Sequence, residues 1–201
     1  MAGTEAESRS EEDRAWVAID TALAIDELVA ILDDVELLFR INPLLEVERF
    51  ATLSPERRRL RALNRSNGRH LDTELVLARL PGGLDVRYTE GLKAATTFRA
   101  EAKGAGSRLV VTDLYSGLTE AERQARLGEV DLSLNAWGRA LHDYLRLWAR
   151  WHWLPPWRWY MRRVWKPMTP SARRIVFLIL AVSVFEIVTF AVILMIWLAV
   201  R

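Results

Sequence analysis

The 201-residue chain contains no cysteine. Disulfide bonds, thiol nucleophiles and cysteine-ligated metal centres are therefore excluded, and the composition fits a reducing compartment. The chain also lacks a phosphate-binding loop, a serine-nucleophile elbow and any internal repeat. We expect neither a metal ion nor a cofactor, and we assign no catalytic residue.

Acidic residues are absent from residues 146–174, a stretch with eight basic residues. The preceding 145 residues carry 19 Lys and Arg against 25 Asp and Glu, a net charge of −6, so the formal net charge of +2 conceals two parts of opposite sign. The acidic part would repel a phosphate backbone, whereas anionic lipid headgroups attract a basic segment beside a membrane. We therefore expect membrane lipids, and no nucleic acid, as partners.

Residues 175–200 contain one ionisable side chain, that of Glu186. A bilayer core about 30 Å thick needs about 20 apolar residues, so this stretch predicts a transmembrane helix. Basic residues precede it and only Arg201 follows, and the positive-inside rule then places the N-terminal part in the cytoplasm. We expect a single-pass, tail-anchored protein of the inner (cytoplasmic) membrane.

Glu186 lies near the middle of the expected span, where a carboxylate facing lipid is costly. Two interpretations stay open. Glu186 contacts a partner membrane protein or a second copy of this chain, or it is a neutral side chain tolerated in a very hydrophobic helix.

Six of the nine tryptophans lie between residues 147 and 165, in "LWARWHWLPPWRWYMRRVW". Amphipathic rings prefer the headgroup level of a bilayer, so we expect residues 153–174 to form an interfacial collar. A helix restarted at Pro155 would carry apolar and basic residues on opposite faces, although an irregular linker is the alternative. The residues expected at the membrane interface are Trp148, Trp151, Trp153, Trp157, Arg158, Trp159, Arg162, Arg163, Trp165 and Lys166.

Residues 1–13 are polar and predict a disordered acidic tail, and residues 14–152 have the size of one domain. A strand is predicted at 15–23 and two short helices at 24–43, where Asp33 and Asp34 can end the first helix and cap the second. Turn residues then separate six predicted strands, at 45–53, 57–66, 69–80, 84–91, 93–102 and 107–117. After them, Thr119 with Glu122 predicts the capped start of a long helix. Its apolar stripe comprises Leu127, Val130, Leu134, Trp137, Leu141, Tyr144, Leu145 and Trp148. The fold class is α+β.

This order resembles the helix-grip fold of the START, polyketide-cyclase and coenzyme Q-binding superfamily. The stretches that carry the resemblance are "AIDELVAILDDVELLFRINPLLEVERF" (24–50) and "GAGSRLVVTDLYSG" (104–117). The resemblance implies a curved antiparallel sheet of about seven strands gripped by the long C-terminal helix. It also implies a cavity between them for a hydrophobic small molecule. The expected walls are Thr73, Leu75, Leu77, Val86, Tyr88, Thr96, Phe98, Leu134, Trp137, Leu141 and Tyr144.

Three functions remain open at this stage. The first is a membrane-tethered binding or transfer module for a hydrophobic ligand such as a lipid, sterol, quinone, isoprenoid or polyketide. The second is an aromatase or cyclase, which would have to use residues such as Tyr88 or Asp113, although their spacing does not argue for a reaction. The third is an accessory subunit of a larger membrane complex. His70, Asp72 and Glu74 alternate along one predicted strand face, and we expect them to point to water.

Overall fold

The computed structural model describes residues 14–91, 93–115 and 120–200, with side chains from residue 133 onward in the last range. The predicted tail at 1–13, the capping pair Thr119–Glu122 and the stripe residues Leu127 and Val130 lie outside the described residues or side chains.

Seven antiparallel strands form one sheet: β1 (Arg14–Thr21), β2 (Leu45–Ser54), β3 (Arg57–Asn64), β4 (Arg69–Leu80), β5 (Gly83–Tyr88), β6 (Ala95–Lys103) and β7 (Gly106–Leu114). Strands β2 to β7 follow one another as a meander, and β1 adds beside β7, so the order is β1-β7-β6-β5-β4-β3-β2. Each predicted strand is present. Gly104, at a φ of 56°, supplies the left-handed backbone of the β6–β7 turn.

Two short helices, α2 (Ile25–Leu32) and α3 (Val35–Ile41), connect β1 to β2. As predicted, Asp34 caps the second helix: its Oδ1 accepts a hydrogen bond of 3.1 Å from the Leu37 amide. Asn42 and Pro43 follow the end of α3. Leu28, Leu32, Leu38 and Phe39 are buried, so the pair contributes a large part of the core.

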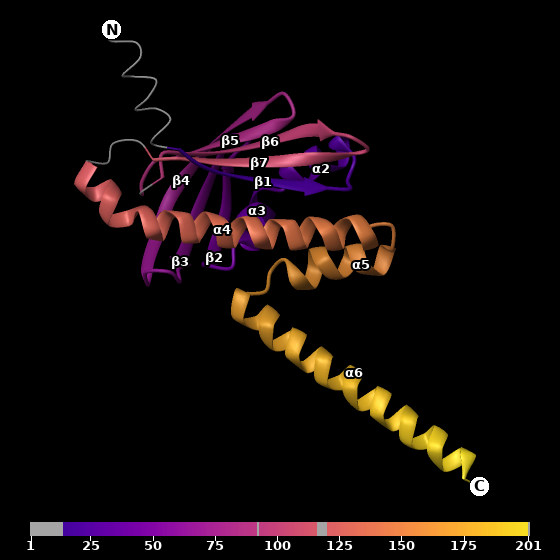
Figure 1. The fold of residues 1–201 in the computed structure, drawn as a ribbon. Helices are drawn as coiled ribbons and strands as arrows, with labels where there is room; N and C mark the ends of the chain where they lie inside the picture. Colours follow the sequence, from indigo (N-terminus) through magenta and orange to yellow (C-terminus); the bar gives the residue numbers. More distant parts are fainter. Residues whose placement is uncertain (1–13, 92, 116–119, 201) are drawn as a thin grey trace.

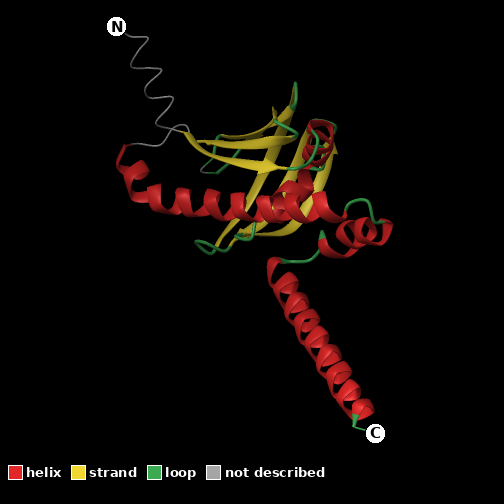
Figure 2. Ribbon diagram, turned by 45° about the vertical axis from the view of Figure 1, so that its right-hand side comes forward, coloured by secondary structure: helices red, strands yellow, loops and turns green. Residues whose placement is uncertain are grey.

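The long helix α4 (Glu120–Trp151) runs across one face of the bent sheet, as Figures 1 and 2 show. The predicted stripe is confirmed where side chains are described, because Leu134, Trp137, Leu141, Tyr144 and Leu145 are buried. Gly138 permits close contact with β1, since a Cβ atom there would lie 2.9 Å from Cγ2 of Val17.

After α4 the chain turns back along the domain through α5 (Pro155–Tyr160) and a π-helical turn η1 (Met161–Trp165). The last helix, α6 (Pro170–Ala199), then leaves the domain and projects away from it (Figure 2). Residues 155–165 are therefore helical, as expected from the two prolines, which occupy the first positions of α5.

Candidate functional site

The expected wall residues all lie on the inward faces of the sheet and of α4. Leu77 and Tyr88 are half-buried and pack against the core. The other nine are buried: Thr73, Leu75, Val86, Thr96, Phe98, Leu134, Trp137, Leu141 and Tyr144. The apolar members of this set belong to, or pack against, one continuous hydrophobic core. Thr73 of β4 lies beside the β5–β6 turn, and its hydroxyl accepts a hydrogen bond of 3.1 Å from the Glu90 amide of that turn. Tyr144 lies near the C-terminal end of α4, beside the collar residue Trp165.

Aromatic rings meet at the centre of the interior. The Trp137 ring lies 5.8 Å from that of Phe39 and 5.6 Å from that of Phe98, and Phe39 contacts Tyr88 edge-on at 6.3 Å. The Trp137 Nε1–H donates a hydrogen bond of 2.9 Å to the Leu38 carbonyl, which satisfies the buried indole. The sequence pattern placed Phe39 on a helix but did not identify it as part of this cluster.

A buried polar network adjoins these rings. Asp113 is fully buried and lies on the inward face of β7 with Leu109 and Val111. Its Oδ1 accepts a hydrogen bond of 2.5 Å from the Thr96 hydroxyl, and its Oδ2 accepts one of 3.3 Å from the Tyr115 hydroxyl. Lys93 forms an ion pair with the same Oδ2. The carboxylate is therefore held by three donors.

The hydrogen bonds of this network have a defined direction. The Thr96 hydroxyl has a single hydrogen, which it donates to Asp113, so the Tyr88 hydroxyl 2.9 Å away is the donor to Thr96. Burial raises the pKa of Tyr88 far above its ordinary value, and the nearby charge of Asp113 raises it further. The Tyr88 phenol therefore stays protonated and able to donate.

Lys93 lies in the β5–β6 turn and reaches inward to Asp113. Its ammonium group lies 5.2 Å from the ring centre of Trp137 and 6.0 Å from that of Tyr115, distances at which a cation is attracted by a ring face. Its side chain is 21% exposed whereas that of Asp113 is 0% exposed, so Lys93 lies where the interior meets solvent. The strand predicted at 93–102 begins two residues later, at Ala95, so Lys93 belongs to the turn, and the sequence pattern did not mark it as a site residue.

The outer face of the sheet carries exposed ion pairs in place of an apolar core. His70, Asp72 and Glu74 point outward, as predicted. Asp72 and Glu74 pair with Arg59 and Arg57 of the neighbouring strand β3, and His70 lies 3.2 Å from Glu48 of β2, one strand further away. A cleft of about 250 Å³ lined by Arg59, Asp72, Thr73, Glu74, Thr89 and Glu90 is polar. Strand β3 is rich in arginine, and ion pairs with other strands balance Arg57, Arg59 and Arg61. Among the described residues, no group of three or more acidic or histidine side chains could hold a metal ion.

Solved structures are similar to this chain over about two thirds of its length. A START superfamily protein from Mycobacterium smegmatis is 16% identical and matches over 66% of this chain and 96% of its own, with a TM-score of 0.51. A protein from Arthrobacter aurescens is 11% identical over 68% of this chain and 87% of its own, with a TM-score of 0.51. The di-domain ARO/CYC StfQ from the steffimycin biosynthetic pathway is 14% identical over 72% of this chain and 54% of its own, with a TM-score of 0.52. No protein-family model and no curated protein matches the sequence.

The chain has the helix-grip fold. The fold predicted from the sequence is confirmed, with α4 as the gripping helix. At identities this low the likeness defines the architecture of the helix-grip domain, and the ligand has to be argued from the residues themselves.

The collar packs against the helix-grip domain along its apolar face. Met161 is buried, and Trp157, Tyr160 and Trp165 pack against the core. The Trp165 ring lies 5.5 Å from that of Tyr144, so the collar contacts the end of α4. The apolar face that the sequence analysis assigned to the bilayer therefore contacts the domain, because Tyr144 and its neighbours offer an apolar surface to it.

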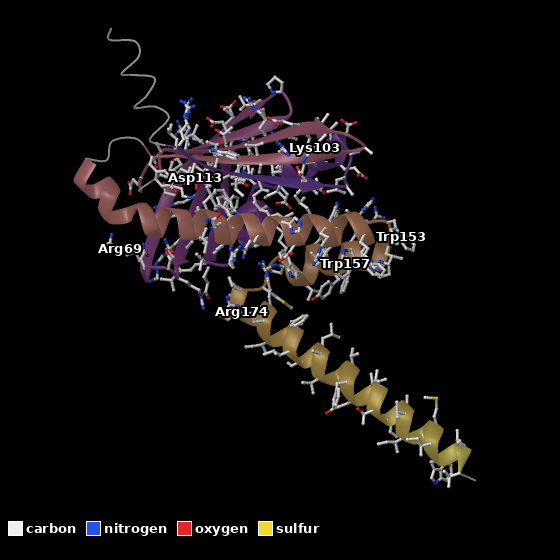
Figure 3. All side chains as sticks on the ribbon, in the orientation of Figure 1. Arg69, Lys103, Asp113, Trp153, Trp157 and Arg174 are labelled. Carbon is white, nitrogen blue, oxygen red and sulfur yellow. The ribbon has the colours of Figure 1, made fainter. Side chains whose placement is uncertain are left out.

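The residues expected at the membrane interface differ in how far they are exposed. Trp148, Trp151, Trp157, Trp165 and Lys166 are half-buried. Trp153 and Trp159 are 66% and 63% exposed, and the exposed basic residues are Arg158, Arg162 and Arg163. Figure 3 shows Trp153 and Trp157 at one end of the domain and Asp113 toward the other. The polar network thus lies beside Trp137, about midway along α4, whereas the collar contacts Tyr144 near the C-terminal end of that helix.

Helix α6 is long and apolar enough to cross a membrane, with a mean hydropathy of 2.7 over its most apolar window and none of that window buried within the structure. Glu186 is exposed on this helix. Length and composition make α6 a candidate membrane span.

Proposed function

We propose that this protein is a membrane-tethered module that binds a hydrophobic small molecule between α4 and the sheet and presents or transfers it at the cytoplasmic face of the membrane. Residues 14–152 are the binding domain, residues 153–174 the collar, and residues 175–200 the anchor. The positive-inside rule supports this orientation, since the eight basic residues at 146–174 precede the span.

One observation carries the proposal: the helix-grip domain is followed, after the collar, by an apolar helix of 30 residues whose most apolar part is not buried within the structure. The fold suggests hydrophobic-ligand binding, because it places a helix over a bent sheet with apolar walls and a few polar groups between them. An apolar ligand already resides in the bilayer, and a tether raises the effective concentration of the domain at that source.

The test is to extract the full chain from its native membrane in polymer-bounded lipid particles and to compare the extracted small molecules by mass spectrometry. The control is a chain that retains only residues 153–201 and so carries the same anchor. The proposal expects one apolar compound to be enriched stoichiometrically with the full chain. Identical extracts from the two chains would contradict it.

The buried network favours one second candidate function, an aromatase or cyclase acting on a membrane-bound polyketide or isoprenoid. Tyr88 and Asp113 are connected through Thr96, so a protonated phenol and a carboxylate share one interior site. Such a pair could donate and accept protons during ring closure of a bound substrate. If wild type converts the co-purified compound to a product and Tyr88→Phe does not, the result would favour the enzyme over the binding module.

A further inference from the structure

The face of the collar that points away from the domain carries arginines without an acidic partner. Arg158, Arg162 and Arg163 are exposed, and none of them forms an ion pair with any residue that the structure describes. On β3, by contrast, Arg57 and Arg59 pair with carboxylates of the neighbouring strand. The positive charge of β3 is therefore balanced within the domain, whereas the charge on the outer face of the collar is not.

Helical spacing gathers these charges on one side of the collar. Arg158 precedes Arg162 by four residues, and Trp159 precedes Arg163 by four, so the members of each pair lie about one turn apart along α5 and η1. Trp159 is 63% exposed among the arginines, although water solvates an indole ring poorly. The outer face thus combines guanidinium groups with an amphipathic ring, a combination that suits the headgroup level of a bilayer.

The apolar face of the collar is occupied by the domain itself. Met161 is buried, and Trp157 and Trp165 pack against the core. These side chains are therefore not available for insertion between lipids. Contact of the collar with a bilayer is left to its outer face, where charge is the main source of attraction.

The collar is held beside the start of α6. The Arg173 guanidinium donates hydrogen bonds of 3.2 Å to the Trp165 carbonyl and 3.3 Å to the Lys166 carbonyl. Figures 1 and 2 show α5 on the side of the domain from which α6 leaves. When α6 spans a membrane, the outer face of the collar therefore lies close to the headgroups at the N-terminal end of the span.

We propose that Arg158, Arg162 and Arg163, with Trp159 among them, form a docking surface for the anionic phospholipid headgroups of the membrane that α6 spans. A guanidinium group binds phosphate oxygens through paired hydrogen bonds, and a headgroup with a net negative charge balances charge that the domain leaves uncompensated. This inference rests on the membrane tether of the proposed function and specifies the class of lipid that the collar contacts.

The experiment uses the full chain in phosphatidylcholine bilayers that contain a trace of spin-labelled phosphatidylglycerol or spin-labelled phosphatidylcholine. Electron spin resonance measures the motionally restricted fraction of each probe, which gives their relative association with the protein. Phosphatidylglycerol should associate at least about threefold more strongly, because each basic residue near the surface attracts anionic lipid. In about 1 M sodium chloride, where the screening length is about 3 Å, most of this preference should be lost.

The collar variant Arg158→Gln/Arg162→Gln/Arg163→Gln removes the proposed surface. It should lose most of the preference for phosphatidylglycerol. The three side chains are exposed and without ion pairs among the described residues, so the variant should unfold near the wild-type temperature.

The matched control is Arg49→Gln/Arg87→Gln/Arg99→Gln, which removes three exposed arginines from β2, β5 and β6. It changes the net charge of the protein by the same amount and leaves the collar intact. Its preference for phosphatidylglycerol should equal that of wild type.

Equal association of the two probes with wild type would overturn the inference, and so would a collar variant that keeps the wild-type preference. An equal loss of preference in the control variant would overturn it as well, because net charge and not the collar surface would then attract the lipid. The proposed function is judged separately, by the compounds that co-purify with the chain.

Discussion

Lys166, in the collar, donates hydrogen bonds of 2.8 and 2.9 Å to the two carboxylate oxygens of Asp34, the residue that caps α3. Lys166 also lies 3.1 Å from Glu36 in the first turn of that helix. Close by, the guanidinium of Arg173 lies 3.7 Å from the ring centre of Trp165 and donates a hydrogen bond of 2.6 Å to the Arg40 carbonyl. The start of α6 is therefore held against α3, and this contact fixes how the domain sits relative to α6.

Lys166→Met should loosen the collar from the domain. Both carboxylates would lose a partner, and the free energy of unfolding should fall by about 1 kcal/mol, a modest value because the pair is partly exposed to solvent. Limited trypsin digestion reports the change, since cleavage after the exposed Arg162 and Arg163 should become faster. Lys103→Met is the matched control, and its collar should be cleaved at the wild-type rate. Equal rates in all three proteins would contradict this role for Lys166.

Acid should weaken the same contact. Burial pushes the pKa of Glu36 upward, but hydrogen bonds from Arg40 and Lys166 outweigh this effect and hold the pKa below its ordinary value of 4.5. The ionised group therefore stabilises the folded state above about pH 4.5, and this contribution is lost as the pH falls through the lowered pKa.

Thermal unfolding followed between pH 7 and pH 3 measures this loss. Glu36→Gln should flatten the acid dependence. Part of the dependence should remain, since hydrogen bonds from Arg108 and Lys103 lower the pKa of Asp20 to about 2. A Glu36→Gln protein with the full wild-type dependence would show that Glu36 does not contribute.

The spacing of hydrophobic residues along the sequence predicted the helices and strands well, because each depends on residues that are close together in the chain. The change from alternating residues to residues at intervals of three and four correctly located the strands and α4. The acidic pair at 33–34 correctly marked the junction of α2 and α3, since an N-cap is a local signal.

The candidate site could be predicted only in part, because its key contacts are distant in sequence. Asp113 was considered, but its pairing with Thr96 depends on the register of β6 against β7. Lys93 was placed at the start of a predicted strand, whereas it lies in the β5–β6 turn. The packing of the collar was missed for the same reason, since Lys166 and Asp34 are 132 residues apart. An amphipathic segment has the same sequence pattern whether its apolar face contacts lipid or protein.

The orientation of the chain can be tested with single cysteines, since the native sequence has none. In sealed cells, a membrane-impermeant maleimide should label Val200→Cys, at the end of α6, and leave Ser66→Cys unlabelled. Ser66 lies in the exposed β3–β4 turn, so Ser66→Cys should react once the membrane is permeabilised. Labelling of Ser66→Cys in sealed cells would place the domain on the opposite side.

Photolabelling of the full chain in its native membrane with an apolar diazirine, 3-(trifluoromethyl)-3-(m-iodophenyl)diazirine, tests the central claim most directly. Peptide mapping then locates the label. If an apolar molecule enters between α4 and the sheet, label should appear on peptides that contain Trp137 and Phe98 as well as on α6. Label confined to α6 and the collar would show that the interior admits no apolar ligand.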